Sequence, residues 1–163
     1  MMRGYMALEQ IAEQAGCPGK IFMQNEEGKE TFMLMLDGDE LTKEHKTVRP
    51  EPVMVFLSEL MTDTDNKGKK AALLSLTQTI RYNKADEDII KDCLHEWQSS
   101  VISLGVIWDQ DEEMFVLKNA FPLPNGTDGL IPQVFLRSVE IFRNEAERLY
   151  EILNLKLTGG EEA

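Results

Sequence analysis

Residues 131–157 read IPQVFLRSVEIFRNEAERLYEILNLKL and carry the clearest pattern in the chain. Apolar side chains recur there at steps of three and four residues, a spacing that places them on one stripe of an α-helix. The stripe consists of Ile131, Val134, Phe135, Val139, Phe142, Ala146, Leu149 and Leu153. Charged and polar residues fill the positions between, so the sequence predicts a long helix with one face on a core and the other in water.

Two further elements precede this helix and complete a unit over residues 85–157. A shorter helical face is predicted at Ile89, Ile90, Cys93, Leu94 and Trp97. Residues 101–108 and 115–121 then alternate along two runs separated by an acidic turn, which predicts a β-hairpin with one strongly apolar face. The second half of the chain therefore reads as helix, hairpin, helix.

The first half, after a predicted helix at residues 5–16, is rich in strands over residues 20–82. Residues 20–24 and 29–36 predict a hairpin, and residues 53–60 form another apolar run that leans towards β-structure. The segment 31–36 is apolar at every position after its first, which predicts burial on both faces. Residues 41–52 are expected to be a polar connection, because two prolines make a helix through them unfavourable.

Residues 71–82 fit two patterns. Leu74, Leu76, Ile80 and Tyr82 share one parity, which favours a strand, but Leu73, Leu76 and Ile80 also fit helical spacing. With either assignment the expected fold class is α+β, a mostly antiparallel sheet with helices packed on it.

Length and composition indicate one domain. The 163 residues, 42% of them hydrophobic, suit a single core that buries roughly two thirds of the surface of the unfolded chain. We expect one domain over residues 1–163, with residues 158–163 as a flexible tail. No run reaches the ~18 apolar residues of a membrane span, and the first residues lack a signal pattern. Two cysteines are too few for a disulfide framework, so a cytoplasmic protein is expected.

The formal net charge of −12 bears on the class of partner. A field of that sign repels phosphate backbones and anionic lipid surfaces. We therefore expect neither a nucleic acid nor a membrane as partner.

Residue patterns for catalysis or metal binding are weak. Residues 62–68, TDTDNKG, resemble the start of a calcium loop, but Lys67 and Leu74 occupy positions that need oxygen ligands. The acidic turn at residues 109–113 could supply only part of a calcium shell. His45 and His95 lack the spacing of a metal site or a catalytic triad. The expectation is a protein that is not an enzyme and holds no metal or cofactor.

Methionines are concentrated in the candidate strands of the first half. Flexible thioethers on an accessible face can fit irregular apolar partners, whereas inside a core they fill gaps. The candidate protein-binding residues are Met33, Met35, Met54 and Phe56. The sequence leaves open whether they form an interface or a core.

The second half of the chain contains a series of motifs that resemble those of a known protein family. Its residues are Cys93-Leu-His-Glu-Trp97, Val106-Ile-Trp108, Phe115-Val-Leu117, Ala120-Phe-Pro-Leu123, Asn125-Gly126 and the amphipathic helix from Leu130. Together they resemble the C-terminal half of the YbjN family, which is similar in fold to type III secretion chaperones. The first half matches only in outline, and the motifs include no catalytic residue. The resemblance implies a module that binds other polypeptides, often as a homodimer.

The sequence is therefore compatible with two functions. The first is a non-catalytic protein-binding module, chaperone-like or a regulatory adaptor, that binds another polypeptide through apolar sheet surface and is a homodimer. The alternative is a small enzyme or small-molecule-binding domain with a pocket between the sheet and the terminal helix. Such a pocket needs convergent polar groups, and the candidates are Ser103 and Asn119.

Overall fold

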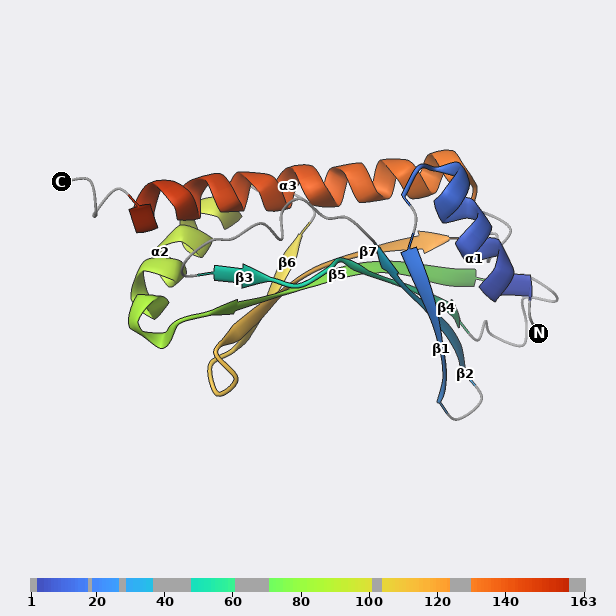
Figure 1. Ribbon diagram of the computed structural model, residues 1–163, viewed down its shortest axis with the longest axis horizontal. Coiled ribbons are helices and arrows are strands. Elements are labelled where there is room, and N and C mark those ends of the chain that lie inside the picture. The colour runs from blue at the N-terminus through green and yellow to red at the C-terminus, as the bar shows by residue number, and fades with distance from the viewer. Residues whose placement is uncertain are drawn as a thin grey trace.

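The fold is given by a computed structural model, shown in Figure 1. It describes residues 3–17, 19–26, 29–36, 48–60, 71–100, 104–123 and 130–158. Within these residues three α-helices pack against one antiparallel β-sheet, which confirms the expected α+β class. The elements in chain order are α1 (Arg3–Gln14), β1 (Gly19–Glu26), β2 (Lys29–Leu36), β3 (Val48–Pro50), β4 (Met54–Leu60), β5 (Ala71–Tyr82), the 3₁₀ turn η2 (Lys84–Asp86), α2 (Glu87–Gln98), β6 (Gly105–Asp109), β7 (Met114–Leu123) and α3 (Pro132–Thr158).

The sheet has the strand order β1-β2-β4-β5-β7-β6, and β3 pairs with β5 beyond the end of β4. All pairs are antiparallel. β5 lies at the centre, with β7 on one side and both β4 and β3 on the other. Between β3 and β4 the chain keeps contact with β5 through Glu51, whose backbone N–H donates to the carbonyl of Thr79 at 2.8 Å. Residues 71–82 are therefore a strand, and the helical alternative is wrong.

The three helices cover one face of the sheet. Figure 1 shows α3 running along the length of the sheet, with α1 near one end of α3 and α2 near the other. Alternate residues of the strands point towards these helices and are fully buried, as at Leu34, Val55, Leu74 and Phe115. This face with the helices forms the core, and the opposite face is called the outer face below.

Helix α3 buries the stripe that its spacing predicts. Its core residues, each at most 1% exposed, are Phe135, Val139, Phe142, Ala146, Leu149 and Leu153. Val134 is half-buried, but Ile131 is 47% exposed, so the expectation that Ile131 joins the stripe is wrong. The reason is that α3 begins at Pro132, so Ile131 precedes the helix and does not share its period.

Helix α2 also follows its predicted face, with one exception. In α2, Ile90, Cys93, Leu94 and Trp97 are buried, whereas Ile89 is 40% exposed. The indole Nε1 of Trp97 donates a hydrogen bond of 2.8 Å to the backbone carbonyl of Glu145, which ties α2 to α3.

Helix α1 spans Arg3–Gln14, so it ends two residues before the predicted boundary at residue 16. Gly16 has a φ of 76°, a conformation that glycine adopts without steric cost. The next N–H, that of Cys17, donates to the carbonyl of Ala12 at 2.9 Å and closes the helix terminus.

Two expectations for the first half need correction. Burial of segment 31–36 on both faces is wrong, because Leu34 and Leu36 are buried while Met33 and Met35 are only half-buried. The cause is the placement of all three helices on one side. The polar connection expected at residues 41–52 also contains a short strand, β3, held by its pairing with β5.

Some expectations fall outside the described residues. These are the calcium-like loop at 62–68, His45, Ser103 and most of the tail expected at 158–163, since α3 extends to Thr158. None of the helices that the structure describes is long and apolar enough to span a membrane.

Candidate functional site

The four candidate binding residues lie together on the outer face of the sheet. In the antiparallel register of β2 and β4, Met33 is directly opposite Phe56 and Met35 is directly opposite Met54. Residues directly opposite each other share a face of the sheet and their side chains touch or nearly touch. All four are half-buried, and we call them the methionine patch.

The patch exists because apolar residues continue through both parities of these two strands. The alternate positions, Leu34, Val55 and Leu57, are at most 1% exposed and pack under the helices. A strand with one covered face normally alternates apolar with polar residues. The core therefore does not require the apolar side chains of the patch.

Small neutral side chains border the patch on β5. Phe56 is paired with Ser75 and Met54 with Thr77, and both partners lie on the outer face. Next along, Ser75 is opposite Ala120 and Thr77 is opposite Lys118 of β7. Lys118 therefore lies in the same cross-strand row as Met54, and Arg81 and Glu51 form an ion pair of 3.0 Å nearer the β3 end of the sheet. The methionine patch itself carries no charge.

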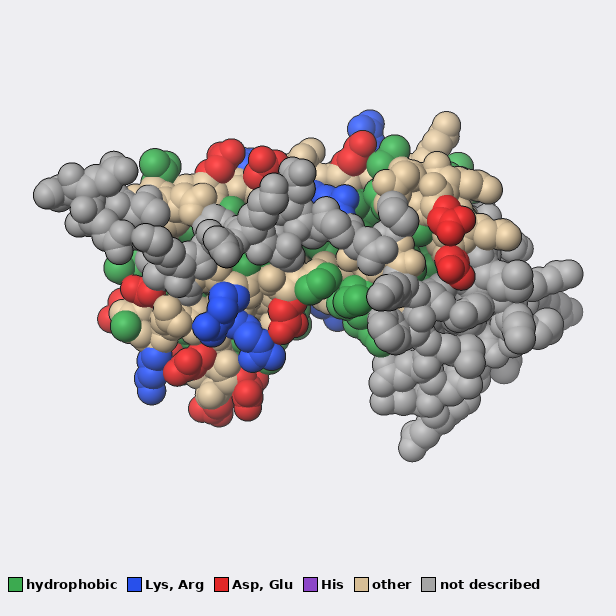
Figure 2. All heavy atoms as spheres, in the orientation of Figure 1, with side chains coloured by type: hydrophobic (Ala, Val, Ile, Leu, Met, Phe, Trp, Pro, Cys, Tyr) green, Lys and Arg blue, Asp and Glu red, His purple; other side chains and the backbone are tan. Residues whose placement is uncertain are grey.

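Figure 2 gives the surface in the same orientation as Figure 1. Hydrophobic side chains gather on the lower side of the molecule, beside the hairpin of β6 and β7. Acidic and basic side chains are mixed over the hairpin end. The outer face thus combines an apolar part with a charged part.

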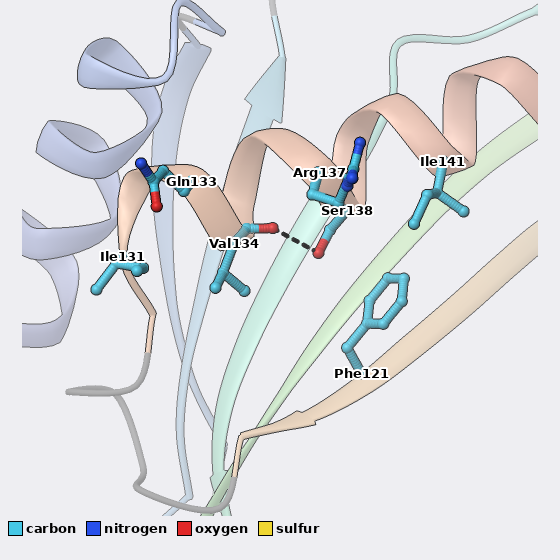
Figure 3. Close-up of a pocket in the computed structure, with 7 residues that line it drawn as sticks. All are labelled: Phe121, Ile131, Gln133, Val134, Arg137, Ser138 and Ile141. Carbon is cyan, nitrogen blue, oxygen red and sulfur yellow. Dashed lines mark hydrogen bonds between the residues drawn. The ribbon is translucent and has the colours of Figure 1, made fainter.

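A second candidate site lies between the sheet and the terminal helix. Its volume is about 300 Å³, and its apolar lining consists of Phe121 of β7 with Ile131, Val134 and Ile141. Figure 3 shows Phe121 rising from β7 towards α3, with Val134 and Ile141 pointing down from the helix. The sequence-based alternative function expected a pocket in this location.

Three polar side chains of α3 complete the pocket: Gln133, Arg137 and Ser138. The hydroxyl of Ser138 is buried and donates a 2.8 Å hydrogen bond to the carbonyl of Val134, so it is already satisfied within the helix. Gln133 and Arg137 are exposed, and within the described part of the chain neither side chain has a hydrogen bond or an ion pair. The free polar groups of the pocket are therefore one amide and one guanidinium.

Asn119, the polar candidate from the sequence, does not line this pocket. It lies on the helix-facing side of β7, two residues before Phe121, and is only 5% exposed. Its amide Nδ2 is buried without a hydrogen-bond partner in the described structure. Such an unsatisfied donor costs about 1–3 kcal/mol.

Sequence reasoning missed a buried polar link at the centre of the fold. Gln78 of β5 is fully buried, accepts a 3.0 Å hydrogen bond from the hydroxyl of Tyr150 and donates one of 3.0 Å to the carbonyl of Glu51. It thereby connects α3 with the break between β3 and β4. The sequence did indicate that Gln78 is buried, because it lies midway between Leu76 and Ile80, at alternate positions of β5 whose side chains face the helices.

An aromatic cluster holds the hairpin end of the sheet. Trp108 of β6 stacks on Phe115 of β7 with ring centroids 5.7 Å apart and lies 5.2 Å from the ring of Tyr82. The ammonium of Lys91 lies 5.7 Å from the centroid of the Trp108 ring. Burial, together with the hydrogen bond to Glu87, raises the pKa of the Tyr82 phenol. The cluster packs the edge strand and offers no group in a reactive state.

The remaining candidates for chemistry lie apart. Cys17 and Cys93 are buried free thiols, and burial raises the pKa of each. His95 is exposed on α2. The described residues contain no group of three or more side chains that could hold a metal ion. In the acidic turn, one carboxylate oxygen of Asp109 accepts a hydrogen bond of 3.3 Å from the backbone N–H of Glu112, so this side chain shapes the turn.

Comparison with protein-family models, curated proteins and solved structures finds no match. Evidence for function therefore comes from the methionine patch and the pocket.

Proposed function

We propose that this protein is a non-catalytic binding module, chaperone-like or an adaptor, whose outer sheet face binds another polypeptide. The same face serves for association of two copies into a homodimer. The observation that carries the proposal is the methionine patch, Met33, Met35, Met54 and Phe56, four apolar side chains left half-exposed on a face that no described helix covers.

The energy available from the patch is modest. Completing the burial of one half-exposed Met or Phe side chain contributes about 1 kcal/mol, so the four give about 4 kcal/mol. Association costs at least about 4 kcal/mol in lost freedom of motion. The patch would therefore offset this cost, and net affinity would come from its neighbours, such as the half-buried Leu73 and the exposed Pro122 opposite it.

Charge favours this surface over the rest of the molecule. Two chains that each carry a net charge of −12 repel one another. Contact through an uncharged apolar surface keeps the acidic groups at the rim, where water and salt screen them. A partner with an apolar segment meets the same requirement, and a basic flank would add attraction.

A matched pair of substitutions tests the proposal. Met33→Glu and the neighbouring Leu34→Glu add the same charge to the same strand, one on the outer face and one in the core. A third variant, Ile107→Glu, adds that charge to the outer face of β6, where the native side chain is 55% exposed and remote from the patch in strand order.

We expect Met33→Glu to fold and to lose association, Leu34→Glu to unfold, and Ile107→Glu to behave like the wild type. Folding is measured by thermal unfolding, self-association by sedimentation velocity, and polypeptide binding by suppression of aggregation of a chemically unfolded model protein. A wild type that sediments as a monomer at all concentrations and leaves that aggregation unchanged would end the binding proposal. Equal association by wild type and Met33→Glu would remove the patch from it.

Small-molecule binding is the second candidate function, and one observation favours it. The pocket between Phe121 and α3 has about 300 Å³ of space, at the lower end of the range of ligand pockets.

A further inference from the structure

We propose that the pocket between β7 and α3 binds a small amphipathic carboxylate, with the aliphatic chain against Phe121 and α3 and the carboxylate on Arg137. This site is separate from the methionine patch and does not rest on the proposed protein-binding function. A straight-chain monocarboxylate of medium length is the chemistry that the pocket fits.

The body of the ligand follows from the lining. Phe121, Val134 and Ile141 are half-buried, and Ile131 is 47% exposed, so all four leave apolar surface in water. An aliphatic chain laid along them would remove that surface from water, which favours binding. The one hydroxyl in the lining, on Ser138, already donates its hydrogen bond to the carbonyl of Val134, so it is not a donor to the ligand.

The head group follows from Arg137. Two exposed cations have acidic partners within the described residues: Arg81 is paired with Glu51 at 3.0 Å, and Lys156 is 4.0 Å from Glu96. Lys118 and Arg148 are exposed without one among these residues, so what distinguishes Arg137 is its place in the lining of the pocket. Arg137 has no such partner in the part of the chain that the structure describes, although the chain has 29 acidic and 17 basic residues. A guanidinium offers a planar pair of N–H donors that matches a carboxylate.

The neighbouring amide of Gln133 supports the same polarity. Gln133 lies one helical turn before Arg137 on α3, so the two side chains are neighbours on the helix surface. In Figure 3 both belong to the helix above the apolar lining. The site therefore has an apolar side, made by Phe121, Val134 and Ile141, and a donor-rich side.

The size of the ligand follows from the volume. At about 30 Å³ per water in the liquid, 300 Å³ corresponds to on the order of ten water volumes. We count about one non-hydrogen atom of the ligand for each water volume. Octanoate has ten non-hydrogen atoms, so we use it as the probe. A long acyl chain would extend out of the pocket.

The experiment is a titration of the folded protein with octanoate, followed by two-dimensional amide NMR. Octanol, which lacks the charge, is the ligand control. Arg137→Gln removes the proposed carboxylate partner. Arg148→Gln makes the same charge change at another exposed arginine of α3 that does not line the pocket.

We expect saturable shifts at residues 133–141 and around Phe121, about tenfold weaker binding by Arg137→Gln, wild-type binding by Arg148→Gln, and weaker binding of octanol than of octanoate. The proposal is overturned by non-saturable shifts, by equal binding of octanol and octanoate, by equal weakening in the two arginine variants, by an Arg137→Gln variant that binds as the wild type does, or by shifts confined to the methionine patch.

The two sites can fail independently. Met33→Glu leaves the pocket intact and should bind octanoate with wild-type affinity even if it loses self-association. Arg137→Gln should associate as the wild type does.

Discussion

Replacing Gln78 by leucine tests whether the buried polar link holds α3 to the break between β3 and β4. Leucine has nearly the same size, so the substitution removes two hydrogen bonds, to Tyr150 and to Glu51, and creates little cavity. A buried hydrogen bond contributes about 1 kcal/mol net, and a buried group left without its partner costs about 1–3 kcal/mol. We therefore expect a loss of about 2–4 kcal/mol in the free energy of unfolding.

Urea unfolding followed by circular dichroism measures this loss directly. For a chain of this length a loss of 1 kcal/mol lowers the melting temperature by about 2–4 °C, so a shift of roughly 5–15 °C is expected. Thr79→Val is the matched control. Thr79 is adjacent to Gln78 in β5, but its side chain lies on the outer face of the sheet and is only half-buried. Its effect should stay within about 0.5 kcal/mol.

A double-mutant cycle identifies the contact itself. Tyr150→Phe removes only the hydroxyl that donates to Gln78. If the hydrogen bond stabilises the fold, the combined variant loses less than the sum of the two single variants, by about 0.5 kcal/mol or more. Additive losses, or a Gln78→Leu variant as stable as the wild type, would refute the reasoning.

Two other predictions concern the core. Phe142→Ala empties a fully buried position on α3 and should cost about 3–5 kcal/mol, seen as a lower urea midpoint, whereas an unchanged midpoint would show that the ring is not buried. Burial raises the pKa of the Cys17 and Cys93 thiols, so at neutral pH the fold suppresses the reactive thiolate. Alkylation by iodoacetamide should therefore be slow in the folded protein and fast in urea, and equal rates in both conditions would contradict it.

Local patterns were sufficient for the helices and most strands. The stripe from Phe135 to Leu153 depends only on the helical period, and the same holds for Ile90, Cys93, Leu94 and Trp97 of α2. Local spacing fails where an element ends, since it assigned Ile131 to a helix that starts one residue later.

Residues 71–82 could not be assigned locally, because their apolar residues fit both periods. Pairing decided the matter: β7 hydrogen-bonds to β5 on one side, and β4 and β3 do so on the other. These partners are distant in sequence, so no window around residue 76 contains them. The role of Gln78 was hidden for the same reason, since its partners Glu51 and Tyr150 lie 27 and 72 residues away from it in the chain.

The sequence by itself determined the fold class and the surplus of apolar residues at Met33, Met35, Met54 and Phe56, since both follow from residue type and period. Only the tertiary structure decided that these four share one surface, because the β2–β4 register sets Met33 against Phe56 and Met35 against Met54, and the helices cover the other face. It alone also placed Arg137 beside an apolar pocket. Local periodicity selects which face of an element is apolar, whereas the packing of elements distant in sequence decides which apolar faces are covered.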